Sequence, residues 1–250
     1  ATELSRLDVS HKKPIINQLE VIMLYKSFIE VVLDAKDRTL AKKHAEKRTQ
    51  NIVRQFVPPN APLCHLESNY VGVLGEIAVY KYLGVSYELT DNYEANQVDE
   101  GDLHYKGLIY DIKTDAVPRS YYSKLYDGSI SNYEKYGCRV FTAKHLHHLK
   151  KYTGGLIFTA IEIPDNAKLT KVEGTIRDAI LNVKSVIIIG YAKQSDVTSH
   201  EPTWYAPKDP KSPSLIKYNS LNYIFHHCDG QGHAPGSSIP TLLRSIKDLV

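Results

Sequence analysis

Three charged side chains that could carry out metal-dependent chemistry lie within the stretch Gly101–Thr114, which reads GDLHYKGLIYDIKT. Its alternating apolar and polar residues predict a β-hairpin with a turn at Tyr105–Gly107. Asp102 then lies on the first strand, and Asp111 and Lys113 lie on the second. Since side chains alternate along a strand, Asp111 and Lys113 share one face, about 7 Å apart. The predicted faces are Leu108, Tyr110, Ile112 and Thr114 on one side, and Ile109, Asp111, Lys113 and Asp115 on the other.

Two carboxylates and an amine on one sheet face form a poor hydrophobic core, because burying them unpaired costs several kcal/mol each. A divalent cation bound by Asp102 and Asp111 removes this cost, since hard cations prefer oxygen ligands. Lys113 can then orient a water molecule or hold a phosphate group. These residue types therefore indicate metal-assisted hydrolysis of a phosphodiester bond. The alternative is a surface hairpin with a weak, exposed Asp–Lys pair.

A helix is predicted before the hairpin, at about Tyr70–Leu83, and Gly84 ends it. Gly72 and Gly75 cost about 1 kcal/mol each relative to Ala, which favours close packing of this helix against another backbone. Glu76 shares its helical face with apolar side chains, so we expect it to be paired or functional.

The helix and the hairpin together resemble the PD-(D/E)XK nuclease superfamily, whose restriction-endonuclease-like fold occurs in restriction, repair, recombination and phage nucleases. The resemblance covers roughly residues 68–192 and rests on Gly75-Glu76, Gly101-Asp102 and Asp111-Ile112-Lys113 in this order. Gly101 departs from the Pro that gives the family its name. The tripeptide alone is weak evidence, since Asp-x-Lys also occurs at Asp34 and Asp209. The resemblance implies an α/β fold with a central mixed β-sheet flanked by helices and an αβββαβ core.

The resemblance further implies a Mg²⁺-dependent endodeoxyribonuclease, with Mn²⁺ able to substitute for Mg²⁺. Its expected metal ligands are Asp102, Asp111, the Ile112 carbonyl and Glu76. Lys113 would position or help to deprotonate the attacking water and stabilise the charge of the phosphorane. The catalytic residues are thus expected to be Asp102, Asp111, Lys113 and Glu76.

Several biological roles stay open at this point. A restriction-type enzyme is the first expectation; it needs base readout and usually a homodimer. A structure- or end-directed nuclease of repair, recombination or phage DNA processing needs only shape recognition. A non-catalytic nucleic-acid-binding module with the same fold and an interaction protein with a purely structural hairpin are alternatives, and RNA is an alternative substrate.

Two segments carry side chains expected to bind nucleic acid. A predicted helix within residues 36–54 has a basic stripe, and a Tyr-rich connection follows the hairpin. The stripe could instead be a solvated helix face, and the connection could pack its own Tyr rings over the sheet. The residues expected to contact DNA are Lys42, Lys43, Lys47, Arg48, Arg119, Tyr121, Tyr122 and Lys124.

The remaining chain is divided by its apolar periodicity and its turn residues. Helices are predicted from Pro14 through Leu33, onward to Phe56, at Phe141–Tyr152 and at Thr241–Val250. Strands are predicted at Val85–Leu89, Leu156–Ile163 and Val186–Ala192. The expected organisation is an N-terminal helical extension (1–60), a nuclease core (61–193) and a loop-rich C-terminal extension (194–250).

Two groups of histidines suggest further sites. His145 and His148 are three residues apart on a predicted helix, where they could form a zinc pair or face solvent or phosphate. His226, Cys228 and His233 could bind zinc, but zinc sites usually pair ligand groups at wider separation.

The composition is that of an ordinary globular chain: 250 residues, 42% hydrophobic, 24% charged, with a net charge of +3. DNA binding would therefore need a local basic patch. Three scattered Cys and no signal pattern favour a reducing, cytoplasmic setting. No apolar run is long enough to span a membrane, so no membrane partner is expected.

Overall fold

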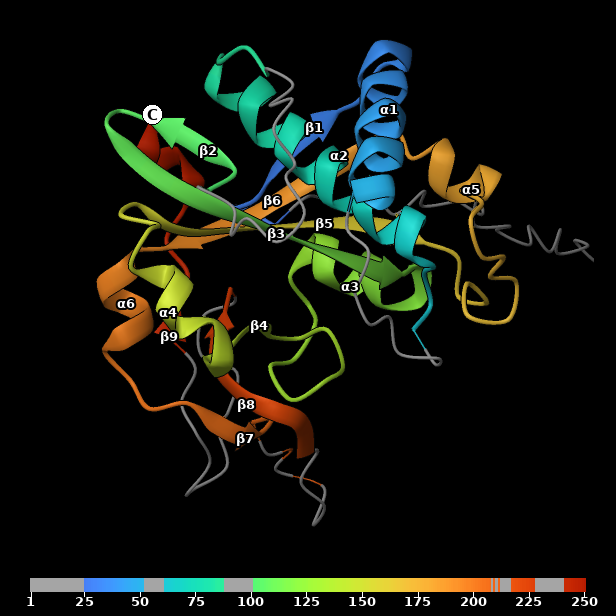
Figure 1. Ribbon diagram of the computed structural model, residues 1–250. Coiled ribbons are helices and arrows are strands. Elements are labelled where there is room, and N and C mark those ends of the chain that lie inside the picture. The colour runs from blue at the N-terminus through green and yellow to red at the C-terminus, as the bar shows by residue number, and fades with distance from the viewer. Residues whose placement is uncertain are drawn as a thin grey trace, which may run out of the picture.

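The computed structural model describes residues 25–51, 61–87, 101–207, 209, 211, 217–227 and 241–250. These residues form a mixed α/β fold in which a curled five-stranded sheet lies between helices (Figure 1). This confirms the expected mixed sheet flanked by helices. Among the described residues, no helix has the length and apolar character needed to cross a membrane.

The large sheet is mixed because one internal pair of strands is parallel. Its order is β1 (Ile29–Val32), β6 (Ser185–Ala192), β5 (Gly155–Ile163), β3 (Leu108–Pro118) and β2 (Leu103–Tyr105). Strands β3 and β5 run parallel, and all other neighbours are antiparallel. The smaller sheet has the order β4 (Arg139–Thr142), β8 (Lys217–His226) and β7 (Thr203–Tyr205), and β9 (Thr241–Leu242) pairs with β8.

Helices cover both faces of the large sheet (Figure 1). One face carries α1 (Ala35–Asn51) and α2 (His65–Leu83). The other carries α3 (Arg119–Asp127), α4 (Leu146–Leu149), α6 (Gln194–Thr198) and the small sheet. The remaining helical turns are α5 (Asp178–Leu181), η1 (Ala143–His145) and η2 (Ile246–Leu249).

Two apolar clusters, one on each face of the large sheet, make up the core. Tyr110 and Ile112 pack with α2 in the first cluster, whereas Val117 belongs to the second and Ile109 packs against it. The predicted alternation of β3 is therefore confirmed, and it leaves Asp111 and Lys113 on the face away from α2.

Helix α2 begins and ends as its sequence dictates. Cys64 and Glu67 form a capping box at its start, and Gly84 ends it with a positive φ of 68°. Helix α2 lies very close to the sheet at Gly75, where a Cβ atom would lie 1.9 Å from Thr114 Oγ1 and 2.6 Å from Thr159 Oγ1. This close approach explains the glycine.

The two glycines of α2 should respond oppositely to substitution by alanine. We expect Gly75→Ala to lower the free energy of unfolding by about 1–3 kcal/mol, because the new methyl group overpacks the interface with β3 and β5. A Cβ atom at Gly72 meets nothing within 4 Å, so Gly72→Ala should raise it by about 0.5–1 kcal/mol. Urea unfolding measures both, and shifts of the same sign would contradict the packing described here.

Several predicted elements take a different form. The predicted helix is wrong at Ile29–Val32, which pair with β6 as strand β1; its part before Tyr25 lies outside the described residues. Val85–Tyr87 are irregular rather than a strand, and Glu88 and Leu89 are outside the described residues.

Other differences concern the segments after the hairpin. The Tyr-rich connection contains helix α3, because β3 ends at Pro118 and Gly128 ends the helix. The helix predicted at Phe141–Tyr152 is reduced to η1 and α4, since Phe141 belongs to β4. The predicted closing helix is replaced by β9 and η2. Residues 194–250 hold strands of the small sheet. The strands predicted at Leu156–Ile163 and Val186–Ala192 are confirmed as β5 and β6.

Candidate metal centre

The candidate centre lies at the edge of β3, just beyond the point where its pairing with the first residue of β2 ends. The register that sets Leu103 opposite Tyr110 would set Asp102 opposite Asp111. The Asp102 N–H still donates to the Tyr110 carbonyl (2.9 Å), but the Asp102 carboxylate turns back and its Oδ2 accepts the Ile112 N–H at 2.6 Å. A carboxylate thus takes the position of a backbone acceptor at the edge of β3.

Asp111 is the buried member of the centre, with 3% of its surface exposed. Lys113 Nζ donates to Asp111 Oδ1 at 2.9 Å and lies 2.8 Å from Oδ2. Oδ2 is buried and forms an ion pair with Lys113 at this distance, without the angle of a hydrogen bond. The Lys113 side chain is 44% exposed, so the centre opens to solvent at the lysine.

The Ile112 carbonyl completes a set of oxygen atoms. The N–H and C=O of one strand residue point to the same side, so the carbonyl shares the strand edge with the Asp102 carboxylate. Mg²⁺ typically takes one or two carboxylates and fills its other positions with water and phosphate. The carboxylate and carbonyl oxygens of Asp102, Asp111 and Ile112 are ligands of the type that Mg²⁺ prefers, and the partly exposed Lys113 would have to turn away from Asp111 Oδ2 for a cation to bind there.

Glu76 does not join this set. Its two oxygens accept from Arg48 Nη1 and Nη2 at 2.6 and 2.7 Å, and Tyr87 Oη donates to Oε2 at 2.8 Å. Among the described residues, no three His, Cys, Asp or Glu side chains gather as a metal-binding group. The expected role of Glu76 beside Asp102 and Asp111 is corrected accordingly, because α2 packs on the face of β3 opposite to Asp111.

The basic residues of α1 also lie away from the centre. Lys42 and Lys43 are exposed and Lys47 is half-buried, whereas Arg48 is turned inward to Glu76. Helix α1 covers the same sheet face as α2, with the sheet between it and the Asp111 side (Figure 1). The structure therefore does not bring the α1 stripe to the candidate centre.

Helix α3 lies on the Asp111 side of the sheet, but its residues differ in availability. Tyr122 is buried in the second core cluster, so its ring cannot stack on bases. The same burial raises the pKa of its hydroxyl. Tyr121 is half-buried, with its ring 5.4 Å from that of Tyr136. Arg119 pairs with Glu162 (2.7 Å), and Lys124 pairs with Glu134 (2.8 Å).

One interaction on this face was not foreseen from the sequence. Asp115 follows Lys113 on the same side of β3, and its Oδ2 accepts from Arg139 Nη1 at 2.5 Å. Arg139 is almost wholly buried. Its position in a short polar stretch of the sequence does not predict this burial. His145 and His148 belong to the turn formed by η1 and α4, which lies on this face of the large sheet (Figure 1).

The other proposed zinc group is only partly described. His226 ends β8, whereas Cys228 and His233 lie outside the described residues. Comparisons of the chain with protein-family models, with curated proteins and with solved structures found no match. Inference about function therefore depends on the geometry of the site.

Proposed function

We propose that this chain is a Mg²⁺-dependent endodeoxyribonuclease of the PD-(D/E)XK type, acting in restriction. The observation that carries the proposal is the meeting of Asp102 with Asp111, Ile112 and Lys113 where β2 leaves β3. Oxygen ligands for a hard cation and an amine for phosphate chemistry are then adjacent.

Asp102, Asp111 and the Ile112 carbonyl would hold the cation. Bound Mg²⁺ supplies Lewis-acid stabilisation of the negative charge that develops on the phosphate. Lys113 orients the attacking water and adds a positive charge beside the phosphate. The water oxygen bonds to phosphorus as its proton passes to solvent, the bond from phosphorus to O3′ breaks, and O3′ takes a proton from solvent and leaves as a hydroxyl. The products carry a 5′-phosphate and a 3′-hydroxyl.

The order of elements supports the family in part. Helix α2 precedes the β2–β3 hairpin, and α3 follows it before β5, which runs parallel to β3. The irregular backbone at Val85–Tyr87 departs from the αβββαβ order, in which a further strand precedes the hairpin.

The first test is incubation of supercoiled plasmid with the protein in Mg²⁺ or EDTA. We expect cleavage only in Mg²⁺, and a loss of about 10²- to 10³-fold in Lys113→Met, which keeps the side-chain stem but removes the charge. Lys168→Met removes an exposed lysine remote from the centre and should cut like the wild type. Cleavage in EDTA, or full activity of Lys113→Met, would refute the mechanism.

The band pattern separates the biological roles. Discrete fragments favour restriction and a homodimer that cuts both strands. Smearing or cutting at junctions or ends favours a structure-directed nuclease of repair, recombination or phage DNA processing.

A non-catalytic nucleic-acid-binding module is the second candidate. The Lys113–Asp111 ion pair favours it, because the lysine neutralises the carboxylate without a cation. A calorimetric titration with Mg²⁺ distinguishes the two, since only the nuclease requires Asp102 and Asp111 to bind it.

A further inference from the structure

A histidine-bearing turn lies on the Asp111 side of the large sheet. Leu149 and Tyr152 pack in the second core cluster, which Ile109 of β3 also contacts. The Gly154 N–H donates to the Ile109 carbonyl (2.7 Å), and the Ile109 N–H donates to Thr153 Oγ1 (3.1 Å). These bonds fix the end of α4 beside the start of the strand that carries Asp111.

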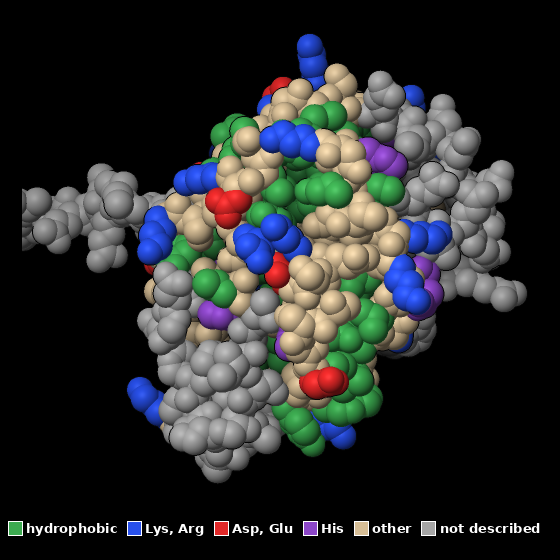
Figure 2. All heavy atoms as spheres, turned by 90° about the vertical axis from the view of Figure 1, so that its left-hand side faces the viewer, with side chains coloured by type: hydrophobic (Ala, Val, Ile, Leu, Met, Phe, Trp, Pro, Cys, Tyr) green, Lys and Arg blue, Asp and Glu red, His purple; other side chains and the backbone are tan. Residues whose placement is uncertain are grey.

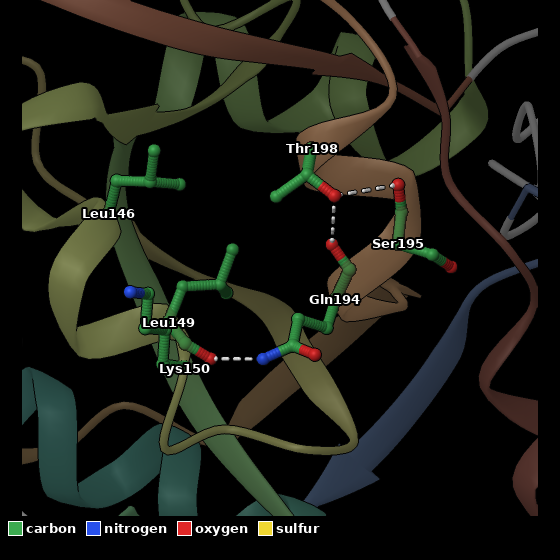
Figure 3. A pocket seen from close by; sticks show the side chains of 6 residues that line it. All are labelled: Leu146, Leu149, Lys150, Gln194, Ser195 and Thr198. Carbon is green, nitrogen blue, oxygen red and sulfur yellow. Dashed lines mark hydrogen bonds between the residues drawn. The ribbon is translucent and has the colours of Figure 1, made fainter.

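Helix α4 also faces α6. Leu146 and Leu149 line a pocket of about 430 Å³ between the two helices, and Gln194 Nε2 donates to the Leu149 carbonyl at 2.7 Å (Figure 3). The leucines are therefore directed to α6, and His145 and His148 occupy a different side of the same turn. Their ring centroids are 5.8 Å apart.

The surroundings of the two histidines are positive. Partial burial lowers the pKa of both, and nearby Lys and His charges, including that of Lys113, lower both further. Asp111 partly offsets this effect at His148. Tyr152, which follows the turn, lies beside Gly101, the residue before Asp102, since a Cβ atom at Gly101 would be 3.5 Å from its ring; the end of the turn is therefore next to the candidate centre.

We infer that His145 and His148 form a phosphate-binding subsite that holds the substrate strand beside the phosphodiester cleaved at Asp111 and Lys113. This inference rests on the proposed nuclease function for its substrate. Positive surroundings favour an anion over a cation at this turn, and neutral imidazoles still offer one N–H donor each. Lys and Arg side chains are spread over the side of the molecule that carries α4 and α6, which would attract a polyanion (Figure 2).

The test uses inorganic phosphate and histidine NMR signals, so that it does not depend on cleavage. We expect saturable shifts of the His145 and His148 ring signals, assigned with His145→Gln and His148→Gln. The signals of His65 and His200, which lie outside this turn, should stay in place. Equal shifts of all histidines, or no saturable shift, would overturn the subsite.

A binding measurement provides the second readout. With Ca²⁺ in place of Mg²⁺, the double variant His145→Gln/His148→Gln should bind a fluorescein-labelled DNA duplex about 10- to 100-fold more weakly. His65→Gln is the matched control, because His65 begins α2 on the opposite face of the large sheet (Figure 1), and the affinity of this variant should be unchanged. Equal affinities of the double variant and the wild type would overturn the subsite even in an active nuclease. Phosphate-dependent shifts in a protein that cuts no DNA would refute the nuclease instead.

Discussion

Asp111→Asn should reduce DNA cleavage by about 10³-fold or more while the fold is kept. In the proposed mechanism, a bound cation would stabilise transition-state charge by several kcal/mol, and each 1.36 kcal/mol lost is about tenfold in rate. Asparagine preserves the volume of a side chain that is 3% exposed, so core packing should not change. Lys113 can turn to solvent when its partner loses charge, because its side chain is already 44% exposed.

The matched control is Asp127→Asn at the end of α3. Asp127 is exposed, and its Oδ1 accepts the Ser129 N–H, a bond that an asparagine oxygen can also accept. Plasmid cleavage and Mg²⁺ titration calorimetry should both be normal in this variant and both be lost in Asp111→Asn. Cleavage retained in Asp111→Asn would show that catalysis does not require the Asp111 carboxylate.

Glu67→Ala should cause the largest loss of stability, about 3–5 kcal/mol, because it leaves a largely buried guanidinium without its partner. Glu67 is fully buried at the start of α2. Arg177 Nε donates to Oε1 and Nη2 donates to Oε2, both at 2.7 Å, and the Arg177 and Cys64 N–H groups also donate to the carboxylate. This pair ties α2 to a segment more than a hundred residues later.

The control for Glu67 is an exposed pair of the same chemical type. Arg119 and Glu162 are 72% and 40% exposed, so Glu162→Ala should cost about 0–1 kcal/mol in urea unfolding. Equal losses in the two variants would contradict the importance assigned to burial.

The Glu67 effect should also depend on pH. Burial by itself would raise the pKa of this carboxyl, but the hydrogen bonds from Arg177 and Cys64 outweigh it and hold the pKa below its usual value of 4.5. A carboxyl with a lower pKa in the folded state stabilises the fold above its unfolded-state pKa. The difference between wild type and Glu67→Ala should therefore be full at neutral pH and shrink as the pH falls through 4.5 and below.

The sequence predicted the parts of the site that depend on local geometry. Alternation along β3 placed Asp111 and Lys113 on one face, and Gly101-Asp102 marked the neighbouring strand. The prediction for Asp111 and Lys113 succeeded because a strand has a fixed period of two, whereas Asp102, predicted on the first strand, lies in a bend just before β2 begins at Leu103. Gly75 likewise predicted a close approach of α2 to another element, which is found at β3 and β5, although the atoms that an added Cβ would meet are the threonine side chains and not backbone; at Gly72 the prediction was wrong, since nothing lies within 4 Å.

What failed depended on partners distant in the sequence. Glu76 and Arg48 each looked available for function, yet they bind one another between α1 and α2. Tyr122 resembled an exposed aromatic residue, but the helix that carries it turns it into the core. Ile29–Val32 fit a helical pattern and form a strand, because pairing with β6 overrides a weak local preference.

The pairing of β1 with β6 also has a consequence for biosynthesis. Ile29 pairs with Ile188, so β1 cannot pair with β6 until roughly 160 further residues have been synthesised. At about 5–20 residues per second, this delay is roughly 8–30 s. During that time Ile29 and Val31 lack the β6 strand that covers them, and the nascent chain is open to incorrect strand pairing.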